Sequence, residues 1–359
     1  MTRLRAACSA SGQSVLPQLV DMIRLRAGPT RLGAHEYIDL RLYDNDKYSF
    51  AQKREFGGTR FKFAVLDSLN SPEWMATGND KLVNYALLRA LGLPYPEIHA
   101  IAAQRPRYFG DTPCFSAKAP LADFIRTEMS YPFFAKPARG YYGIGACAVS
   151  AYHAADDALE LYDGSRLPVT EFTDQLLEHA GEGYLFQECL HSHPDVAAVC
   201  GNTVTTCRLD IFLDGDGPRL FYNTWKIPTG NNMIDNFHDG LTGNLLGLLD
   251  NDSGTVKRVV DGIGPDQDEV MQHPDTHQRL PGFRIPEWDR IKALCFKAAT
   301  AFPGLRFQGW DVAVTPRGPV LVELNASSDL HGRQYASGRG VYNARLKDYL
   351  SRNARRKKR

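Results

Sequence analysis

The feature that most constrains the fold is a pair of apolar, β-branched runs near the end of the chain. Residues 307–314 and 319–325 flank a Pro/Gly turn, a pattern that predicts a β-hairpin. Side chains alternate along a strand, so Glu323 and Asn325 point to the same face, and the turn brings Asp311 beside them within one residue of register. Such hard oxygen ligands suit Mg²⁺. The hairpin therefore predicts a magnesium site, with a merely solvated strand edge as the alternative.

Length and charge narrow the class of protein. The 359 residues allow two or three domains, or one composite enzyme. A net charge of only +1 argues against general attraction to nucleic acid or to an anionic membrane. No apolar run is long enough to span a bilayer, and no signal peptide is visible. We expect a cytoplasmic protein without a nucleic-acid partner or stable membrane insertion, for which a homodimer is a compatible assembly.

The cysteines and the basic end of the chain add two expectations. Seven scattered cysteines without a Cys-x-x-Cys pair argue against a disulfide framework and a structural zinc site, and for a reducing compartment. The run Arg355–Arg359 is typical of a solvated, disordered tail, and contact with nucleic acid or membrane is the minority interpretation.

The first 75 residues predict a helix-rich region without a βαβ repeat. Ser14–Ala27 reads as an amphipathic helix that ends at Gly28, and Phe61–Leu66 reads as a strand. We expect the helix to pack against the main body rather than a membrane. Its apolar face would consist of Leu16, Leu19, Val20 and Ile23.

Two lysines stand where an anionic ligand would favour them. Asn79 or Asp80 can cap a helix that carries Lys81 in its first turn, where the helix dipole disfavours a cation unless an anion lies nearby. Further on, an apolar strand delivers Lys136. Lys81 alone is more simply a surface lysine, so the pair matters more than either residue.

A glycine-rich loop follows Lys136. Gly140, Gly143 and Gly145 permit positive φ and close approach of the backbone to a ligand. The spacing fits neither a Walker A loop nor a dinucleotide fingerprint. The loop can instead fold over phosphates as a flap whose N–H groups donate, or form a simple hairpin turn.

The middle of the chain supplies polar groups on short strands. Residues 183–190 predict a strand whose backbone could pair with an adenine edge, and Asp195 could accept from ribose hydroxyls. A β-rich run over 203–212 carries Arg208, whose guanidinium can grip phosphate or carboxylate oxygens, although surface ion pairing is the alternative. Lys226 lies on another short strand.

Two later segments complete the pattern. The polar loop 235–244, with Asn236 and His238, could line a substrate or nucleotide pocket or could be a plain Asn/Asp/Gly connection. Pro286 predicts the first turn of a helix that buries Trp288 and Ile291 and ends near Gly304.

The order of these motifs resembles the ATP-grasp superfamily. The helix opened by Asp80-Lys81, the strand with Lys136 and its glycine loop, Gln187-Glu188-x-Leu190, Arg208 on a strand and the Asp311…Glu323-x-Asn325 hairpin occur in that order. The segment Asp235-Asn236-Phe237, the Gly309-Trp310-Asp311 triplet and the final Gln334 resemble the sugar-transfer-associated branch, which is related to α-L-glutamate ligases. The resemblance covers about residues 35–335.

The resemblance implies an α+β fold in which two subdomains clamp ATP between antiparallel sheets. The implied divisions are an N-terminal region over 1–75, a small subdomain with the flap over 76–185, a large subdomain with the Mg²⁺ site over 186–345 and a basic tail over 346–359. The residues implied to hold ATP are Lys81 and Lys136 at the phosphates, Gly140, Gly143 and Gly145 in the flap, Gln187, Glu188 and Leu190 at the adenine, and Asp195 at the ribose.

The same resemblance implies the roles of the remaining residues. Arg208 and Lys226 would stabilise the transferring phosphoryl group, and one or two Mg²⁺ ions, replaceable by Mn²⁺, would bind Asp311, Glu323 and Asn325. The residues implied to face the acceptor substrate are Asn236, His238, His331, Arg333 and Gln334.

The implied reaction joins a small-molecule carboxylate to an amine. ATP would phosphorylate the carboxylate, the amine would displace phosphate from the acylphosphate, and ADP and phosphate would be released. A phosphotransferase acting on a hydroxyl and a non-catalytic ATP-binding module are the alternatives, and fold-level analogy does not choose between them.

Overall fold

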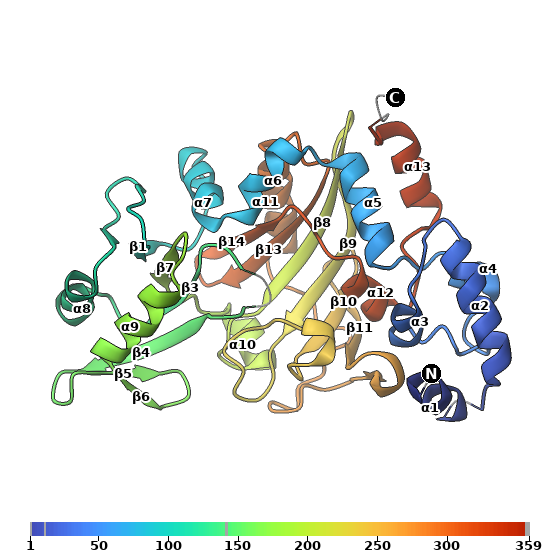
Figure 1. Cartoon of the computed structure of the whole chain (residues 1–359), viewed down its shortest axis with the longest axis horizontal. Helices are drawn as coiled ribbons and strands as arrows, with labels where there is room; N and C mark the ends of the chain where they lie inside the picture. The colour runs from blue at the N-terminus through green and yellow to red at the C-terminus, as the bar shows by residue number, and fades with distance from the viewer. Residues whose placement is uncertain (1, 11, 141–142, 356–359) are drawn as a thin grey trace.

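The computed structural model describes residues 2–10, 12–140 and 143–355, so all of the predicted basic tail after Arg355 lies outside the described residues. The chain forms two seven-stranded sheets, a smaller one at the left of Figure 1 and a longer-stranded one at its centre. Most helices of the N-terminal region lie at the right. The predicted α+β class with a helical N-terminal region is therefore confirmed. Among the described residues, no helix combines the length and apolarity needed to cross a membrane.

The smaller sheet has the strand order β2-β1-β7-β3-β4-β5-β6 and is antiparallel except for the β1–β2 pair. Helices α8 (Lys118–Thr127) and α9 (Val169–His179) bury apolar side chains against it, around Phe133 and Phe186. Its strands are β1 (Ile98–Ala102), β2 (Cys114–Phe115), β3 (Phe133–Pro137), β4 (Cys147–His153), β5 (Ala158–Leu161), β6 (Arg166–Pro168) and β7 (Tyr184–Glu188).

The larger sheet is built from three hairpins and a short edge strand, in the order β12-β11-β10-β9-β8-β13-β14. All of its pairings are antiparallel. The predicted hairpin near the end of the chain is its β13–β14 edge. The strands are β8 (Thr206–Asp214), β9 (Gly217–Ile227), β10 (Leu245–Leu249), β11 (Val256–Asp261), β12 (Asp268–Glu269), β13 (Phe307–Thr315) and β14 (Gly318–Asn325).

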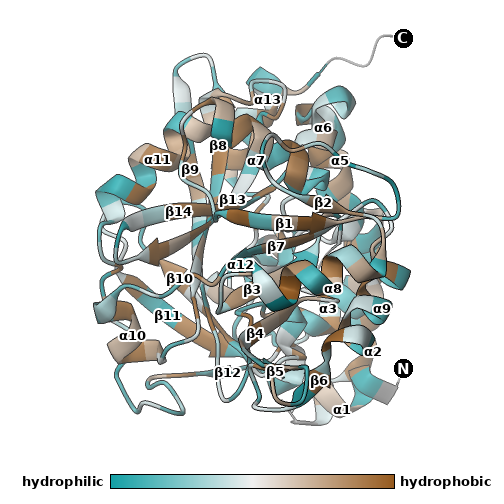
Figure 2. Cartoon of the chain, turned by 90° about the vertical axis from the view of Figure 1, so that its left-hand side faces the viewer, coloured by the Kyte–Doolittle hydropathy of each residue, from teal (hydrophilic) through white to brown (hydrophobic). Residues whose placement is uncertain are grey.

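The two faces of the larger sheet bury different cores. Helix α11 (Trp288–Thr300) packs on β8, β9, β13 and β14, while α12 (His331–Ser337) packs on β9, β10 and β11. Successive leucines of β10 alternate between these cores, since Leu245 joins the cluster that contains α11 and Leu246 joins the one that contains the N-terminal helices. The sheet therefore separates α11 from the N-terminal region. Figure 2 shows the smaller sheet and its two helices from their own side.

The N-terminal region is helical throughout, but two of its details differ from prediction. Residues 61–66 belong to a helix rather than a strand, because Phe61, Val65 and Leu69 recur with helical spacing and are buried together. The first seven helices are α1 (Thr2–Ala10), α2 (Val15–Ala27), α3 (Ala34–Asp39), α4 (Phe50–Lys53), α5 (Thr59–Leu69), α6 (Pro72–Asn79) and α7 (Lys81–Ala90).

Helix α2 is present as predicted, but the predicted buried face is wrong. Leu16 and Ile23 are 71% and 70% exposed, whereas Gln18 and Leu25 are buried. Gln18 accepts a hydrogen bond of 2.5 Å from the Tyr37 hydroxyl, and this buried polar contact rotates the helix away from the face that hydrophobicity alone selects. The start predicted for α11 is also early, since Pro286 precedes it and Glu287 has a left-handed backbone with φ of 55°.

Three contacts join the two sheets at one corner, near the turn between β13 and β14. The Leu321 N–H donates to the Pro94 carbonyl at 3.0 Å, and the His193 N–H donates to the Val314 carbonyl at 2.7 Å. The Glu188 carboxylate at the end of β7 pairs with the Arg317 guanidinium in the turn. The remaining elements are α10 (Pro194–Cys200), α13 (Ala344–Asn353) and short 3-10 turns at His238–Gly240 and Gly264–Asp266.

Candidate active site

Strand register brings the predicted magnesium ligands and phosphoryl-contacting residues together. Asp311 of β13 lies opposite Glu323 of β14 and, on its other side, opposite Arg208 of β8. Lys226 of β9 reaches the same place from the next strand, because its partner on β8 is Thr206. Four neighbouring strands thus deliver two carboxylates and two cations to one patch of the larger sheet.

Asp311 is the centre of this patch. Its carboxylate accepts two hydrogen bonds from Arg208, at 2.5 and 2.8 Å, and one from the Lys226 ammonium at 3.0 Å. The Asn325 amide nitrogen lies 3.4 Å from the same carboxylate. Burial would raise the pKa of Asp311, but Arg208 and Lys226 outweigh it and hold the pKa well below its ordinary value. Asp311 is therefore ionised throughout the physiological pH range.

Lys81 and Lys136 approach from α7 and the smaller sheet. The N-cap Asp80 accepts from the Leu82 and Val83 N–H groups, as the predicted helix start requires. The Lys81 ammonium lies 3.1 Å from the Glu323 carboxylate and 3.3 Å from the Gly140 carbonyl of the flap. Lys81 therefore links the flap to the predicted metal ligand Glu323.

Lys136 is buried, with 8% of its surface exposed. Its ammonium donates to the Tyr85 hydroxyl at 3.0 Å, and that hydroxyl donates to the Val322 carbonyl at 2.6 Å. Burial lowers the pKa of Lys136 to about 8, although Glu323 and Asp311 oppose the shift. A bound polyanion would restore full protonation of this lysine. The sequence analysis gave Tyr85 no role.

The flap glycines have the backbone freedom that was predicted for them. Gly140, Gly143 and Gly145 have φ of 153°, 72° and 78°. A Cβ at Gly143 would lie 2.3 Å from the Ile234 side chain, so the flap touches the segment that precedes the polar loop 235–244. Residues 141–142 lie outside the described residues.

The predicted adenine segment is only partly available. Strand β7 is paired with β1 on one side and β3 on the other, so the backbone from Tyr184 to Glu188 is not free to pair with a base, contrary to the prediction. The free segment begins after Glu188 and includes Leu190. Gln187 is buried, and its Oε1 atom has no hydrogen-bond partner in the structure. Asp195 lies in the first turn of α10 with an exposed side chain, 3.7 Å from His193.

Two of the residues predicted at the acceptor have protein partners instead of an open surface. Arg333 is 2% exposed and forms an ion pair of 2.8 Å with Asp210 on β8. Gln334 is 1% exposed, and its amide forms two hydrogen bonds with the Gly57 backbone, at 2.8 and 2.9 Å. The structure places both residues between α12 and its neighbours. Their role toward a substrate stays a prediction.

The other acceptor-side predictions lie on loops. The Asn236 carbonyl accepts from Thr242 and Asn244, so its backbone shapes the 235–244 loop. His238 opens a tight turn with φ of 43°. Asp235, which precedes them, accepts from Thr206 at 2.6 Å and lies 3.9 Å from Lys226, so the sequence analysis gave it too small a role. These contacts connect the loop to the cations around Asp311.

His331 joins the N-terminal region to the segment that follows the metal ligands. Its Nδ1 lies 2.9 Å from Asp329, and its Nε2 lies 3.5 Å from Glu36 of α3. Glu36 also accepts from the backbone N–H groups of Gly33 and Thr59, at 2.6 and 2.5 Å. Burial alone would lower the pKa of His331, but the two carboxylates raise it to about 10.

This arrangement predicts a pH dependence of stability. A raised histidine pKa contributes stability that is fully present below the unfolded value of about 6.5 and is lost as the pH rises through the folded value near 10. We expect the melting temperature of wild type to exceed that of His331→Gln by about 5 °C at pH 6.5. The difference should shrink toward zero by pH 10. Differential scanning calorimetry of both proteins across this range provides the measurement, and a difference independent of pH would contradict the prediction.

The donor set at Asp311, Glu323 and Asn325 fits Mg²⁺. Two carboxylates and an amide oxygen are hard ligands, and Mg²⁺ keeps waters or phosphate oxygens in its other positions. Among the described residues, no group of three or more His, Cys, Asp or Glu is placed to hold a metal. If these residues hold Mg²⁺, waters or phosphate oxygens would have to complete the coordination shell.

Comparisons with known proteins identify the family of the chain. Residues 61–348 match a family model described as sugar-transfer associated ATP-grasp. A search of the curated proteins found no match. Similar solved structures include the ATP-grasp ligase PsnB complexed with a minimal precursor (18% identity, TM-score 0.42) and D-alanine-D-alanine ligase from Helicobacter pylori (11% identity, TM-score 0.46). Each similarity covers 79% of this chain and 64% of the other chain.

Proposed function

Because the chain belongs to the sugar-transfer associated ATP-grasp family, we propose that it is an ATP-dependent ligase that joins a small-molecule carboxylate to an amine. The reaction would proceed through an acylphosphate and release ADP and phosphate. The likeness to PsnB and D-alanine-D-alanine ligase concerns proteins named as ligases, but the structural similarity is too low to carry the argument.

The charge pattern of the site is the observation that carries the proposal. Lys81, Lys136, Arg208 and Lys226 gather around Asp311 and Glu323, and they come from both sheets and from α7. With Asp235, which lies 3.9 Å from Lys226, four cations face three carboxylates, so the cations are in excess even before a metal ion is added. Such an excess of buried positive charge is expensive unless an anion neutralises it. A triphosphate bound between the two sheets meets that need.

The residues of this chain can supply each requirement of the reaction. A carboxylate oxygen of the substrate attacks the γ-phosphorus while the bond to the bridging oxygen breaks, and ADP leaves. Arg208 and Lys226 would neutralise charge on the transferring phosphoryl oxygens, and Lys81 and Lys136 would hold the phosphates of ATP. The amine nitrogen then attacks the acyl carbon, loses a proton and expels phosphate. The flap around Gly143 would keep water from hydrolysing the intermediate.

A divalent metal would complete this site. Asp311, Glu323 and Asn325 would hold one or two Mg²⁺ ions, which would neutralise the phosphate oxygens. Because both oxygens of Asp311 are already bonded to Arg208 and Lys226, Glu323 is the ligand we expect to contribute most to metal affinity. These roles, together with the acceptor-facing positions of Asn236 and His238, are part of the proposal.

An assay that supplies a universal amine tests the proposal without knowledge of the natural one. Purified protein would be incubated with Mg²⁺, ATP, pooled carboxylic acids and hydroxylamine, which converts acylphosphates to hydroxamates. A parallel reaction would contain pooled amino acids, amines and amino sugars. Nucleotide, phosphate and hydroxamate would be quantified in both, with Glu323→Gln as the inactive control.

The products separate the candidate reactions. ADP, free phosphate and a hydroxamate support the ligase. ADP with a stable phosphorylated acceptor would make the protein a phosphotransferase, and AMP with pyrophosphate would rule out the acylphosphate route. ATP binding without turnover over both pools would favour a non-catalytic module.

A further inference from the structure

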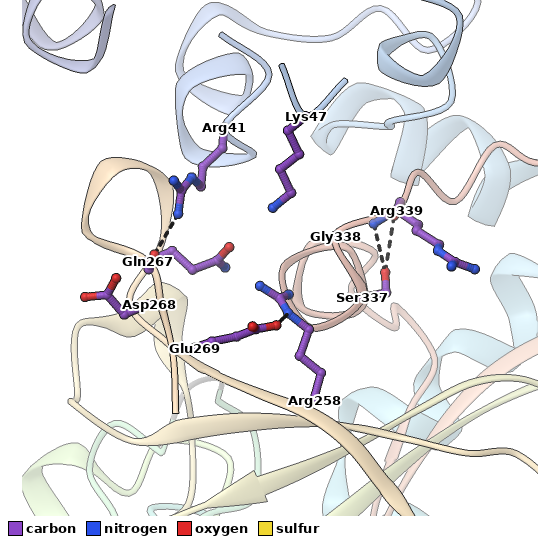
Figure 3. Close-up of a pocket in the computed structure, with 9 residues that line it drawn as sticks. All are labelled: Arg41, Lys47, Arg258, Gln267, Asp268, Glu269, Ser337, Gly338 and Arg339. Atoms are coloured by element: carbon purple, nitrogen blue, oxygen red, sulfur yellow. Dashed lines mark hydrogen bonds and ion pairs between the residues drawn. The ribbon is translucent and has the colours of Figure 1, made fainter. Parts of the chain in front are cut away.

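We propose that a cavity between the N-terminal region and the end of α12 binds a small ligand through a phosphate group. The cavity has a volume of about 410 Å³ and lies four strands from β13 across the larger sheet, beside β11 and β12. Figure 3 shows its side chains. The residues that line it include Arg41, Lys47, Arg258, Gln267, Glu269 and Gly338.

Three cationic side chains point into this cavity from two parts of the chain. Arg41 and Lys47 enter from the segment between α3 and α4, and Arg258 enters from β11 on the opposite side (Figure 3). Gly338, which ends α12 with φ of 62°, forms part of the wall. A Cβ at Gly338 would lie 3.8 Å from both the Lys47 ammonium and one Arg258 terminal nitrogen. Both cations are therefore close enough to contact one bound group.

The carboxylates of the cavity do not balance these cations. Glu269 is already paired with Arg258. Asp268 also lines the cavity, but its carboxylate points away from the three cations in Figure 3. In the described part of the chain, no ion pair within 4.0 Å involves Arg41 or Lys47. In the described residues, Arg41 and Lys47 therefore have no carboxylate in direct contact, although Asp44 and Glu269 act on Lys47 from farther away.

Arg41 lines the cavity and is held in place by its backbone and by one hydrogen bond. Its backbone is held at φ of 57°, which is uncommon for a residue other than glycine. One terminal nitrogen donates to the Gln267 carbonyl at 2.8 Å, while the buried Nε has no hydrogen-bond partner. This Nε has almost no accessible surface and does not face the cavity, so the terminal nitrogens of Arg41 are the donors that a bound anion would meet. Burial, Arg258 and Arg41 also lower the pKa of the Lys47 ammonium. A bound anion would raise that pKa again, so Lys47 also favours an anion in the cavity.

A phosphate group fits this set of donors better than a carboxylate. It carries up to two negative charges and several acceptor oxygens in a tetrahedral arrangement, which can meet guanidinium and ammonium donors from opposite walls. A single carboxylate would leave one cation uncompensated. Arg41 and Lys47 precede the segment 61–348 that matches the family, so the site is a feature of this chain's N-terminal region and not of the matched segment alone.

Calorimetric titration of the full chain would test the site. Inorganic phosphate and glycerol phosphate would be titrated at constant ionic strength, which separates free phosphate from a phosphorylated organic ligand. The variants would be Lys47→Gln, whose side chain is exposed enough to leave the fold intact, and the double variant Arg41→Gln/Lys47→Gln. Lys257→Gln is the matched control, because Lys257 lies next to Arg258 on β11 but pairs with Asp250 instead of lining the cavity.

Charge-assisted hydrogen bonds set the expected size of the effect. Affinity for the phosphate compound should fall about tenfold in Lys47→Gln and further in the double variant, with no change in Lys257→Gln. Equal affinity in wild type and the double variant, at equal melting temperature without phosphate, would overturn the proposal. Equal stabilisation of wild type by chloride and by phosphate at matched ionic strength would also overturn it.

Discussion

Glu323→Gln is expected to lower the rate of ADP formation by about 10³-fold, the largest effect among the changes considered for this chain. The substitution keeps the size of the side chain but removes the charge that pairs with Lys81 at 3.1 Å and that would bind Mg²⁺. Because Asp311 is already bonded to two cations, it is poorly placed to replace the lost ligand. The hydroxamate assay with Mg²⁺ and ATP gives the rate.

Two controls separate a chemical effect from a structural one. Glu171→Gln makes the same chemical change on an exposed part of α9 and should leave the rate unchanged. The melting temperature of Glu323→Gln should stay within about 2 °C of wild type, because Glu323 is partly exposed and lies at the end of β14. A rate within threefold of wild type would place Glu323 outside the reacting centre.

Arg333→Met is expected to lower the free energy of unfolding by about 3–5 kcal/mol, the largest stability effect. The substitution leaves the Asp210 carboxylate without its ion-pair partner at a position that is 2% exposed. Ser328 still donates to that carboxylate at 2.6 Å, but one neutral hydrogen bond does not replace a buried counter-charge. Urea unfolding followed by tryptophan fluorescence measures the loss.

A variant that also changes Asp210 distinguishes a structural role of Arg333 from a role in substrate binding. The double variant Arg333→Met/Asp210→Asn should recover much of the lost stability, because no unpaired charge remains buried. Arg345→Met is a control at a partly buried arginine that donates to the Leu220 and Phe221 carbonyls. If Arg333→Met instead kept its stability and raised the KM of the acceptor, Arg333 would face the substrate as the sequence analysis predicted.

The sequence predicted well what depends on local pattern. Alternation along 307–325 predicted the β13–β14 pairing, and the structure puts Asp311 opposite Glu323. The start of helix α7 was predicted in the same way, with Asn79 or Asp80 as its cap, and the structure shows Asp80 in that position. Such features follow from residues within about 20 positions of one another. They cover the carboxylate half of the candidate site.

Local sequence pattern could not predict contacts between segments that lie far apart in the sequence. Lys226 and Asp311 are 85 positions apart, and Gln334 and Gly57 are 277 apart. No periodicity within either segment indicates which partner it meets. The same cause explains the error at α2, where a hydrogen bond from Tyr37 to Gln18 overrides the apolar stripe, and the omission of Tyr85, which is defined by the lysine and carbonyl it contacts.

The corner where Glu188 meets Arg317 determines how the two sheets can move. The sheets are fastened there by an ion pair and by two backbone hydrogen bonds from His193 and Leu321. Lys81 adds a further link away from this corner, because its ammonium lies 3.1 Å from Glu323 on β14 and 3.3 Å from the Gly140 carbonyl of the flap. A rotation of the two sheets about the corner would therefore have to stretch or break the Lys81–Glu323 pair and would move the flap with it.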